Sequence, residues 1–299
     1  MKDARASNPP EPEWASAWVG THHRVLTYLL INAMEVVYFF VYGFLNPLKV
    51  RHRERLPALQ PGDLYAIGPH EAQVTDGILP GLLWFPFSLL PSAPDKLPWV
   101  LATMKHLGDD WRDVARLAHV IPVVQSGVEG DGNSRETLRH IKWTLAHGSV
   151  IYYPGGTRAA HQTVPRGDAA AGALARAAEV QRITPIGLYN PAQPYRHHVS
   201  DPSLTLPRWV DNLLIRATSS RWRRVSKLAK VLRALDWLIG VRIGQRPVIT
   251  IGEPMTPETL RSRVKALRAN RAVTGIQASL NQCYADILME DIQRLREEP

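Results

Sequence analysis

Cysteine is almost missing from this chain of 299 residues, which contains only Cys283. A single cysteine excludes an internal disulfide and any metal site built from several cysteines. We interpret Cys283 as a packed helix residue and not as a nucleophile. The sequence also lacks a Gly-x-Ser-x-Gly nucleophile elbow, internal repeats and low-complexity tracts. These absences leave histidine, carboxylate and arginine side chains as the main candidates for catalysis.

Acidic residues are scarce relative to basic ones, with 27 Asp and Glu against 36 Lys and Arg, which gives a net charge of +9. An excess of this size suits an anionic partner, such as nucleic acid, an acidic membrane surface or a phosphorylated substrate. Most of the excess lies between Arg221 and Arg246, where Asp236 is the one acid among eight basic residues. No nucleic-acid motif accompanies the basic residues, so we predict no nucleic-acid partner.

An apolar stripe at helical spacing runs through this same basic stretch. The stripe consists of Trp222, Val225, Leu228, Ala229, Leu232, Leu235 and Ile239. A basic amphipathic helix with tryptophans is typical of docking on a membrane surface that contains anionic lipids. The alternative is a helix packed on the core with a solvated, charged back. The sequence leaves both open.

The N-terminal part divides into a polar, proline-containing tail (residues 1–24), predicted to be disordered and without a cleavable signal peptide, and an apolar stretch (residues 25–48). The apolar stretch is long enough to cross a bilayer as a helix. Glu35 near its centre would cost roughly 2.5 kcal/mol or more if it faced lipid. We therefore favour a membrane-associating helical motif that is re-entrant or interfacial, or spans poorly. A buried helix of a soluble core is the alternative.

Short apolar strands alternate with helical segments along the rest of the chain. Strands are expected near residues 48–51, 64–68, 99–103, 120–124, 150–153, 183–188 and 248–252, and helices near 111–118, 134–146 and 168–180. This alternation predicts an α/β fold with a mostly parallel central sheet flanked by helices. We expect an α/β domain over residues 49–260, with the basic amphipathic insertion at 195–247, followed by C-terminal helices over 261–299.

Two of these strands stop at polar loops. The first strand leads to His70 and Asp76, and the second leads to the turn Gly155-Gly156-Thr157-Arg158. Ligands of open α/β sheets bind at the carboxyl ends of strands. A histidine beside a carboxylate can act as a general base, and an arginine can clamp a phosphate or carboxylate. The two loops together predict a base facing an anion pocket.

With these elements placed, the chain resembles the glycerolipid acyltransferase superfamily, typified by 1-acylglycerol-3-phosphate acyltransferases. In that family a His-x4-Asp motif ends one strand and a Glu-Gly-Thr-Arg motif ends another. Further matching segments, over about residues 25 to 260, are Glu54–Pro57, Lys105, Ala146–Val150, Gly172–Ala175 with Thr184–Ile186, and Ile251–Pro254.

The resemblance implies transfer of a fatty acyl group from acyl-CoA or acyl carrier protein to the hydroxyl of a lysophospholipid or related lipid. It implies His70 as general base and Asp76 as its partner. Gly155, Gly156, Thr157 and Arg158 would bind substrate, with Lys105 and Arg166 as secondary candidates. No metal and no bound cofactor is implied. We expect the protein to act at the cytoplasmic face of a membrane, as a peripheral or monotopic protein.

One spacing and three positions depart from the family pattern. His70 and Asp76 are separated by five residues instead of four, and Pro69, Gly155 and Gln125 stand where the family has Asn, Glu and Arg. Glu71 is a second possible partner for His70. The lost Glu and Arg motivate an alternative, a non-catalytic lipid-binding membrane protein on the same scaffold. A metal hydrolase is disfavoured because no second histidine lies at ligand spacing from His70.

Overall fold

The computed structural model covers the whole chain and describes a defined part of it. The described residues are 25, 26, 29, 33, 36, 39–69, 98–103, 120–123, 134–155, 167–192, 201–203, 205–273 and 279–298.

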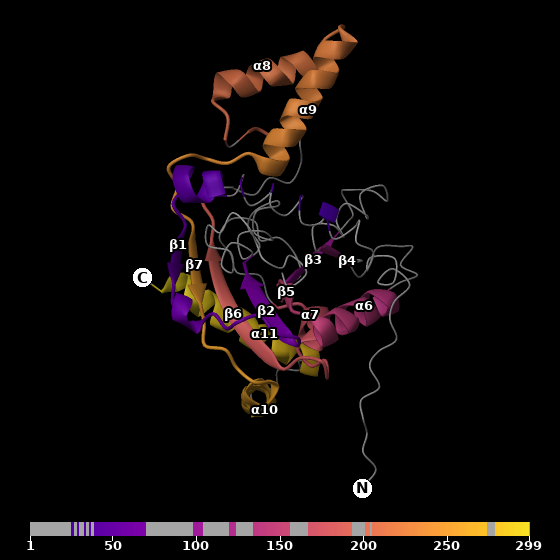
Figure 1. Cartoon of the computed structure of the whole chain (residues 1–299), viewed down its shortest axis with the longest axis vertical. Coiled ribbons are helices and arrows are strands. Elements are labelled where there is room, and N and C mark those ends of the chain that lie inside the picture. Colours follow the sequence, from indigo (N-terminus) through magenta and orange to yellow (C-terminus); the bar gives the residue numbers. More distant parts are fainter. Residues whose placement is uncertain are drawn as a thin grey trace.

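The centre of the molecule is a seven-stranded sheet with the order β1-β7-β6-β2-β5-β3-β4 (Figure 1). Its strands are β1 (Lys49–Arg51), β2 (Asp63–Gly68), β3 (Trp99–Thr103), β4 (Val120–Val123), β5 (Val150–Tyr152), β6 (Arg182–Tyr189) and β7 (Val248–Ile251). All neighbouring strands are parallel except β6 and β7, which are antiparallel. The predicted α/β class with a mostly parallel sheet is therefore confirmed.

The strands form where the sequence has short, nearly continuous apolar runs. Every residue of β2 is buried, and Leu64 and Tyr65 face opposite apolar clusters. Strands that are covered on both faces need apolar side chains at successive positions, whereas strands with one solvent-exposed face alternate apolar and polar side chains. The unbroken run in β2 therefore fits its central position between β6 and β5.

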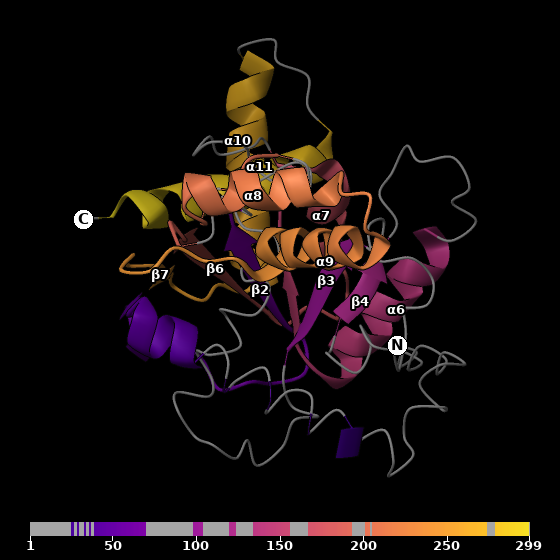
Figure 2. The same cartoon turned by 90° about the horizontal axis from the view of Figure 1, so that it is seen from above.

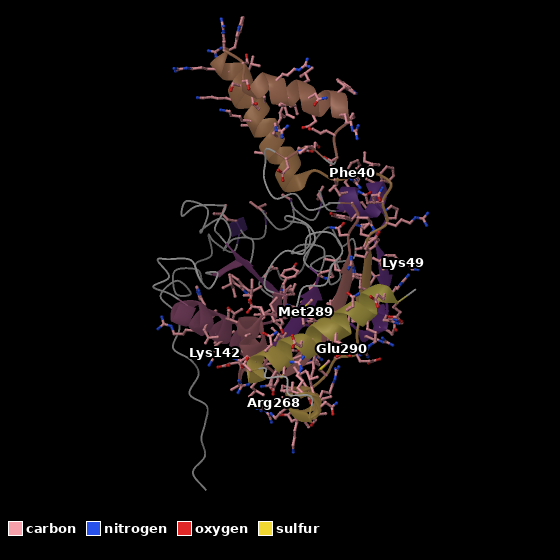
Figure 3. All side chains as sticks on the ribbon, turned by 180° about the vertical axis from the view of Figure 1, so that it is seen from behind. Phe40, Lys49, Lys142, Arg268, Met289 and Glu290 are labelled. Atoms are coloured by element: carbon pink, nitrogen blue, oxygen red, sulfur yellow. The ribbon has the colours of Figure 1, made fainter. Side chains whose placement is uncertain are left out.

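One face of the sheet is covered by α6 (Ser134–His147), α7 (Ala169–Leu174), α10 (Pro257–Val273) and α11 (Leu280–Glu297). The helix α11 contacts β2, β6 and β7, and Figure 3 shows it running across the back of the sheet. Glycines permit this close packing: a Cβ on Gly187 would lie 2.8 Å from the backbone nitrogen of Arg296, and one on Gly172 would lie 1.8 Å from the Asn281 carbonyl oxygen.

The opposite face holds a second apolar cluster, which includes Tyr42 from the π-helical turn η1 (Phe40–Leu45). The described positions between Val25 and Phe39 are helical as well. In the described part of the chain, no helix combines the length and the apolar character needed to cross a membrane. The membrane association predicted for residues 25–48 stays a prediction.

Between β6 and β7 the chain forms two further helices, α8 (Arg208–Thr218) and α9 (Arg223–Ile239), joined by a short turn. They pack against each other as a hairpin that projects beyond the sheet (Figures 1 and 2). The predicted helix in the basic stretch is thus present as α9. The apolar stripe is divided, because Ala229 is buried whereas Leu228 and Trp222 are exposed.

The helix expected over residues 168–180 is much shorter in the structure. The helix α7 ends at Leu174, and tight turns follow in which the amides of Ala177 and Val180 donate to carbonyls three residues back. Beyond them, Gln181 donates its amide to the Gly62 carbonyl, just before β6 begins beside β2. Pairing with β2 therefore overrides the helix propensity of the alanines. The helix expected over residues 111–118 lies outside the described residues.

Candidate functional site

The carboxyl ends of β2 and β5 define the candidate site. The two strands are parallel neighbours, with Leu64 opposite Val150 and Ala66 opposite Tyr152. The strand that follows β2 in the chain, β3, lies on the β5 side of it, whereas the strand that follows β5, β6, lies on the β2 side. The chain thus leaves these two neighbours in opposite directions along the sheet. Such a reversal is a topological switch point, where open α/β sheets bind ligands.

The backbone at this edge leads directly into the two predicted loops. Gly68 ends β2 and is followed by buried Pro69, one residue before His70. From β5 the chain continues through Pro154 to Gly155, and the amide of Asp168 donates to the Pro154 carbonyl oxygen at 2.6 Å. This bond fixes the start of the second loop against the start of the segment that carries α7.

Of the predicted site residues, the described part of the chain includes Gly155, which is half-buried in the turn after β5. His70, Asp76, Lys105, Gly156, Thr157, Arg158 and Arg166 lie outside the described residues, as do Glu71 and Gln125. Their proposed contacts with one another stay predictions. What the sheet order adds is that the loops of His70 and of Arg158 begin at neighbouring strand ends.

Tyr152, the last residue of β5, is a buried polar group that the sequence did not single out. Its side chain lies in the apolar cluster under α11 and α6, and its hydroxyl has no hydrogen-bond partner among the described residues. Burial raises the pKa of this hydroxyl, so it stays protonated and cannot serve as a base. The alternation of β5 places it on the face away from Ile151, which belongs to the other cluster.

A charged cluster lies at the opposite, amino-terminal ends of β2 and β6. Arg182 donates from Nε to Asp63 Oδ1 at 2.9 Å and from Nη2 to Oδ2 at 2.7 Å. Tyr65 Oη and the Gln60 amide also donate to Asp63 Oδ2, at 3.2 and 2.9 Å. The hydrogen bonds to Asp63 raise the pKa of Arg182, while burial and then the charge of Asp63 raise the pKa of Tyr65. We interpret this cluster as structural, because its groups are paired to one another and because it lies at the end of the strands opposite the switch point.

The described ranges contain no group of three or more His, Cys, Asp or Glu side chains that could hold a metal ion.

Comparisons with known proteins include a likeness to a solved structure. No protein-family model matches the chain, and no curated protein matches it. The crystal structure of the 1-acyl-sn-glycerophosphate (LPA) acyltransferase PlsC from Thermotoga maritima is similar with a TM-score of 0.43 and 13% sequence identity, over 97% of this chain and 84% of that one. At that score the likeness carries no argument about function.

Proposed function

We propose that this protein is a membrane-associated O-acyltransferase. It moves a fatty acyl group from acyl-CoA or acyl carrier protein to the hydroxyl of a lysophospholipid or a related lipid, at the cytoplasmic face of a membrane. The observation that carries the proposal is the pairing of β2 with β5 at a switch point. This pairing starts the His70 loop and the Gly155–Arg158 turn from neighbouring strand ends, as one active site requires.

The proposed reaction needs a base and no nucleophile from the protein. His70 takes the proton from the acceptor hydroxyl while that oxygen attacks the thioester carbonyl, and Asp76 holds the imidazole in the required tautomer. The tetrahedral intermediate then collapses with cleavage of the C–S bond. The thiolate leaves with its electron pair and takes the proton from the imidazolium. Products are the acylated lipid and the free thiol, and His70 is regenerated.

Arg158 is the proposed anion ligand of the site. A guanidinium binds a phosphate or carboxylate through two parallel hydrogen bonds, which fixes orientation as well as charge. Gly155 and Gly156 would let the backbone approach the same group closely. Lys105 and Arg166 are proposed as secondary contacts with the anionic parts of donor or acceptor.

The decisive experiment measures turnover of purified protein with several lysolipids and acyl thioesters, for the natural sequence and for His70→Ala. Loss of a general base should lower the rate by at least about 10²-fold. Glu71→Gln is the matched control, because it removes the neighbouring carboxylate and leaves the proposed pair of His70 and Asp76. A rate for His70→Ala within threefold of the natural protein, with an unchanged circular dichroism spectrum, would refute the base assignment.

The non-catalytic alternative makes a different prediction in the same experiment. The change from the family's Glu to Gly155 favours it, since a carboxylate has been lost from the second motif. A lipid-binding protein would bind lysolipids but turn over none of the donor and acceptor pairs, and His70→Ala would leave binding unchanged. Measurable turnover that depends on His70 would exclude it.

A further inference from the structure

The hairpin of α8 and α9 exposes large apolar side chains to solvent. Trp209 is 70% exposed, Trp222 in the turn 76% and Leu228 60%. On α8, Leu213 follows Trp209 by four residues, and on α9, Val225, Leu228 and Leu232 recur at helical spacing, so each helix carries an exposed apolar stripe. Contiguous exposed apolar surface on a soluble protein usually marks an interaction site.

The charges exposed on the hairpin all have one sign. Seven of its charged side chains are exposed and every one is basic: Arg208, Arg216, Arg221, Arg223, Arg224, Lys227 and Lys230. Its two acids are turned inward. Asp211 pairs with buried Arg233, and Asp236 accepts a hydrogen bond from Thr205. The hairpin therefore presents apolar side chains and positive charge together.

The hairpin is held together by buried polar side chains, which are separate from its exposed apolar and basic side chains. Arg233 Nη1 donates to Asp211 Oδ1 at 2.7 Å, and both side chains are more than nine-tenths buried. The Ser203 amide donates to Asp211 Oδ2 at 3.0 Å, and Arg233 Nη2 donates to the Asp201 carbonyl at 3.1 Å. Substitutions in the exposed stripes therefore leave these buried hydrogen bonds in place.

The hairpin lies at the same edge of the sheet as the candidate site. It connects the carboxyl end of β6 to the amino end of antiparallel β7, so it starts and ends at the edge where β2 and β5 also end. The chain after α9 is tied to η1, because the Gly244 amide donates to the Leu45 carbonyl and the Gln245 amide to Asn46 Oδ1.

The turn η1 adds to the apolar surface at this edge, since Phe40 and Phe44 are both exposed and stack on each other. Figure 3 shows Phe40 toward the hairpin end of the molecule and Arg268 of α10 at the opposite end. Two segments that are far apart in sequence thus place exposed aromatic and apolar groups on one side.

We propose that the α8–α9 hairpin docks on a bilayer containing anionic lipids, with its apolar stripes at the acyl boundary and its basic side chains among the headgroups. Apolar side chains combined with exposed charge of one sign match an interfacial element, whereas an acidic protein surface would match the charge alone. Docking would turn the carboxyl edge of the sheet toward the lipid. The inference does not depend on acyl transfer.

A label on the hairpin itself tests the proposal in the full chain. Cys283 is fully buried, so a cysteine introduced as Leu228→Cys can be labelled selectively with an environment-sensitive nitrobenzoxadiazole dye. The matched control is Arg268→Cys on α10, an exposed position at the other end of the molecule. Vesicles of phosphatidylcholine with and without phosphatidylglycerol are titrated in, some of them carrying nitroxide lipids as quenchers.

We expect the Leu228→Cys label to shift to the blue and to be quenched by nitroxide lipids when phosphatidylglycerol is present, while the Arg268→Cys label does not change. Because the signal reports the hairpin itself, attachment through residues 25–48 does not hide the result. A hairpin label that stays as accessible to water as the control overturns the proposal, whether or not the protein sediments with vesicles.

Charge substitution supplies the second readout. In the Leu228→Cys background, Arg223→Gln, Arg224→Gln, Lys227→Gln and Lys230→Gln together should weaken the transition by about 600-fold at low salt, since each basic residue near an anionic surface adds about fivefold. The control removes equal charge elsewhere, by Arg261→Gln, Lys265→Gln, Arg268→Gln and Arg294→Gln. Equal losses in the two variants would overturn the proposal. The assay contains no substrate, so its outcome is independent of whether the protein is an acyltransferase.

Discussion

Asp63→Ala should destabilise the fold strongly while sparing the site. The Asp63 side chain is 3% exposed and accepts four hydrogen bonds, two of them from Arg182. Removing one partner of a buried ion pair costs about 3–5 kcal/mol, because the other charge stays buried without compensation. Arg182 keeps 27% of its side chain exposed, so water can partly solvate it, and we expect a loss of about 3 kcal/mol.

The measurement is the free energy of unfolding in urea, together with the melting temperature, which should fall by roughly 6–12 °C. Asp63→Asn is the graded control, since its amide oxygen still accepts hydrogen bonds, and it should lose less. The cluster lies at the amino ends of the strands, so turnover per folded molecule should be unchanged below the melting range. A loss under 1 kcal/mol, or a fall in turnover without a loss of stability, would show that the assignment of a structural role is wrong.

Two further predictions concern the site. Arg158→Ala should raise the KM for an anionic substrate more than it lowers kcat; if kcat alone falls, Arg158 acts in the transition state and the ground-state clamp is refuted. Tyr152→Phe should leave kcat/KM unchanged and raise the free energy of unfolding by about 1 kcal/mol, because it removes a buried hydroxyl that has no partner in the described part of the chain. A loss of stability in Tyr152→Phe would mean that the hydroxyl is hydrogen-bonded in solution.

Local pattern was sufficient to predict most regular elements. The strands β2, β3 and β5 begin and end close to the predicted bounds, and α6 occupies the predicted segment before Gly148. Apolar runs of four to six residues and a helix bounded by turn-forming residues are short-range signals, so they survive without knowledge of the partners. The position of the His70 loop and of the Gly155–Arg158 turn directly after predicted strands was also visible in the sequence.

Long-range packing was not visible in the sequence. The helix α11 has a mixed polar and apolar pattern, yet it contacts β2 and β6 at the centre of one face, because a glycine such as Gly187 on β6 lets it approach. The helix α8 was not predicted at all. Alanines after Leu174 favoured a longer helix than α7, and strand pairing ended it.

The sequence by itself determined the fold class, the basic charge and the two loops that would hold the chemistry, since these depend on residue type and on spacing within one segment. Only the tertiary structure decided that β2 and β5 are neighbours and that the chain leaves them in opposite directions. Only the tertiary structure, likewise, showed Val225, Leu228 and Leu232 of α9 open to solvent beside α8 instead of packed on the core. Strand order and exposure depend on contacts between segments far apart in the chain, which no local pattern of residues specifies.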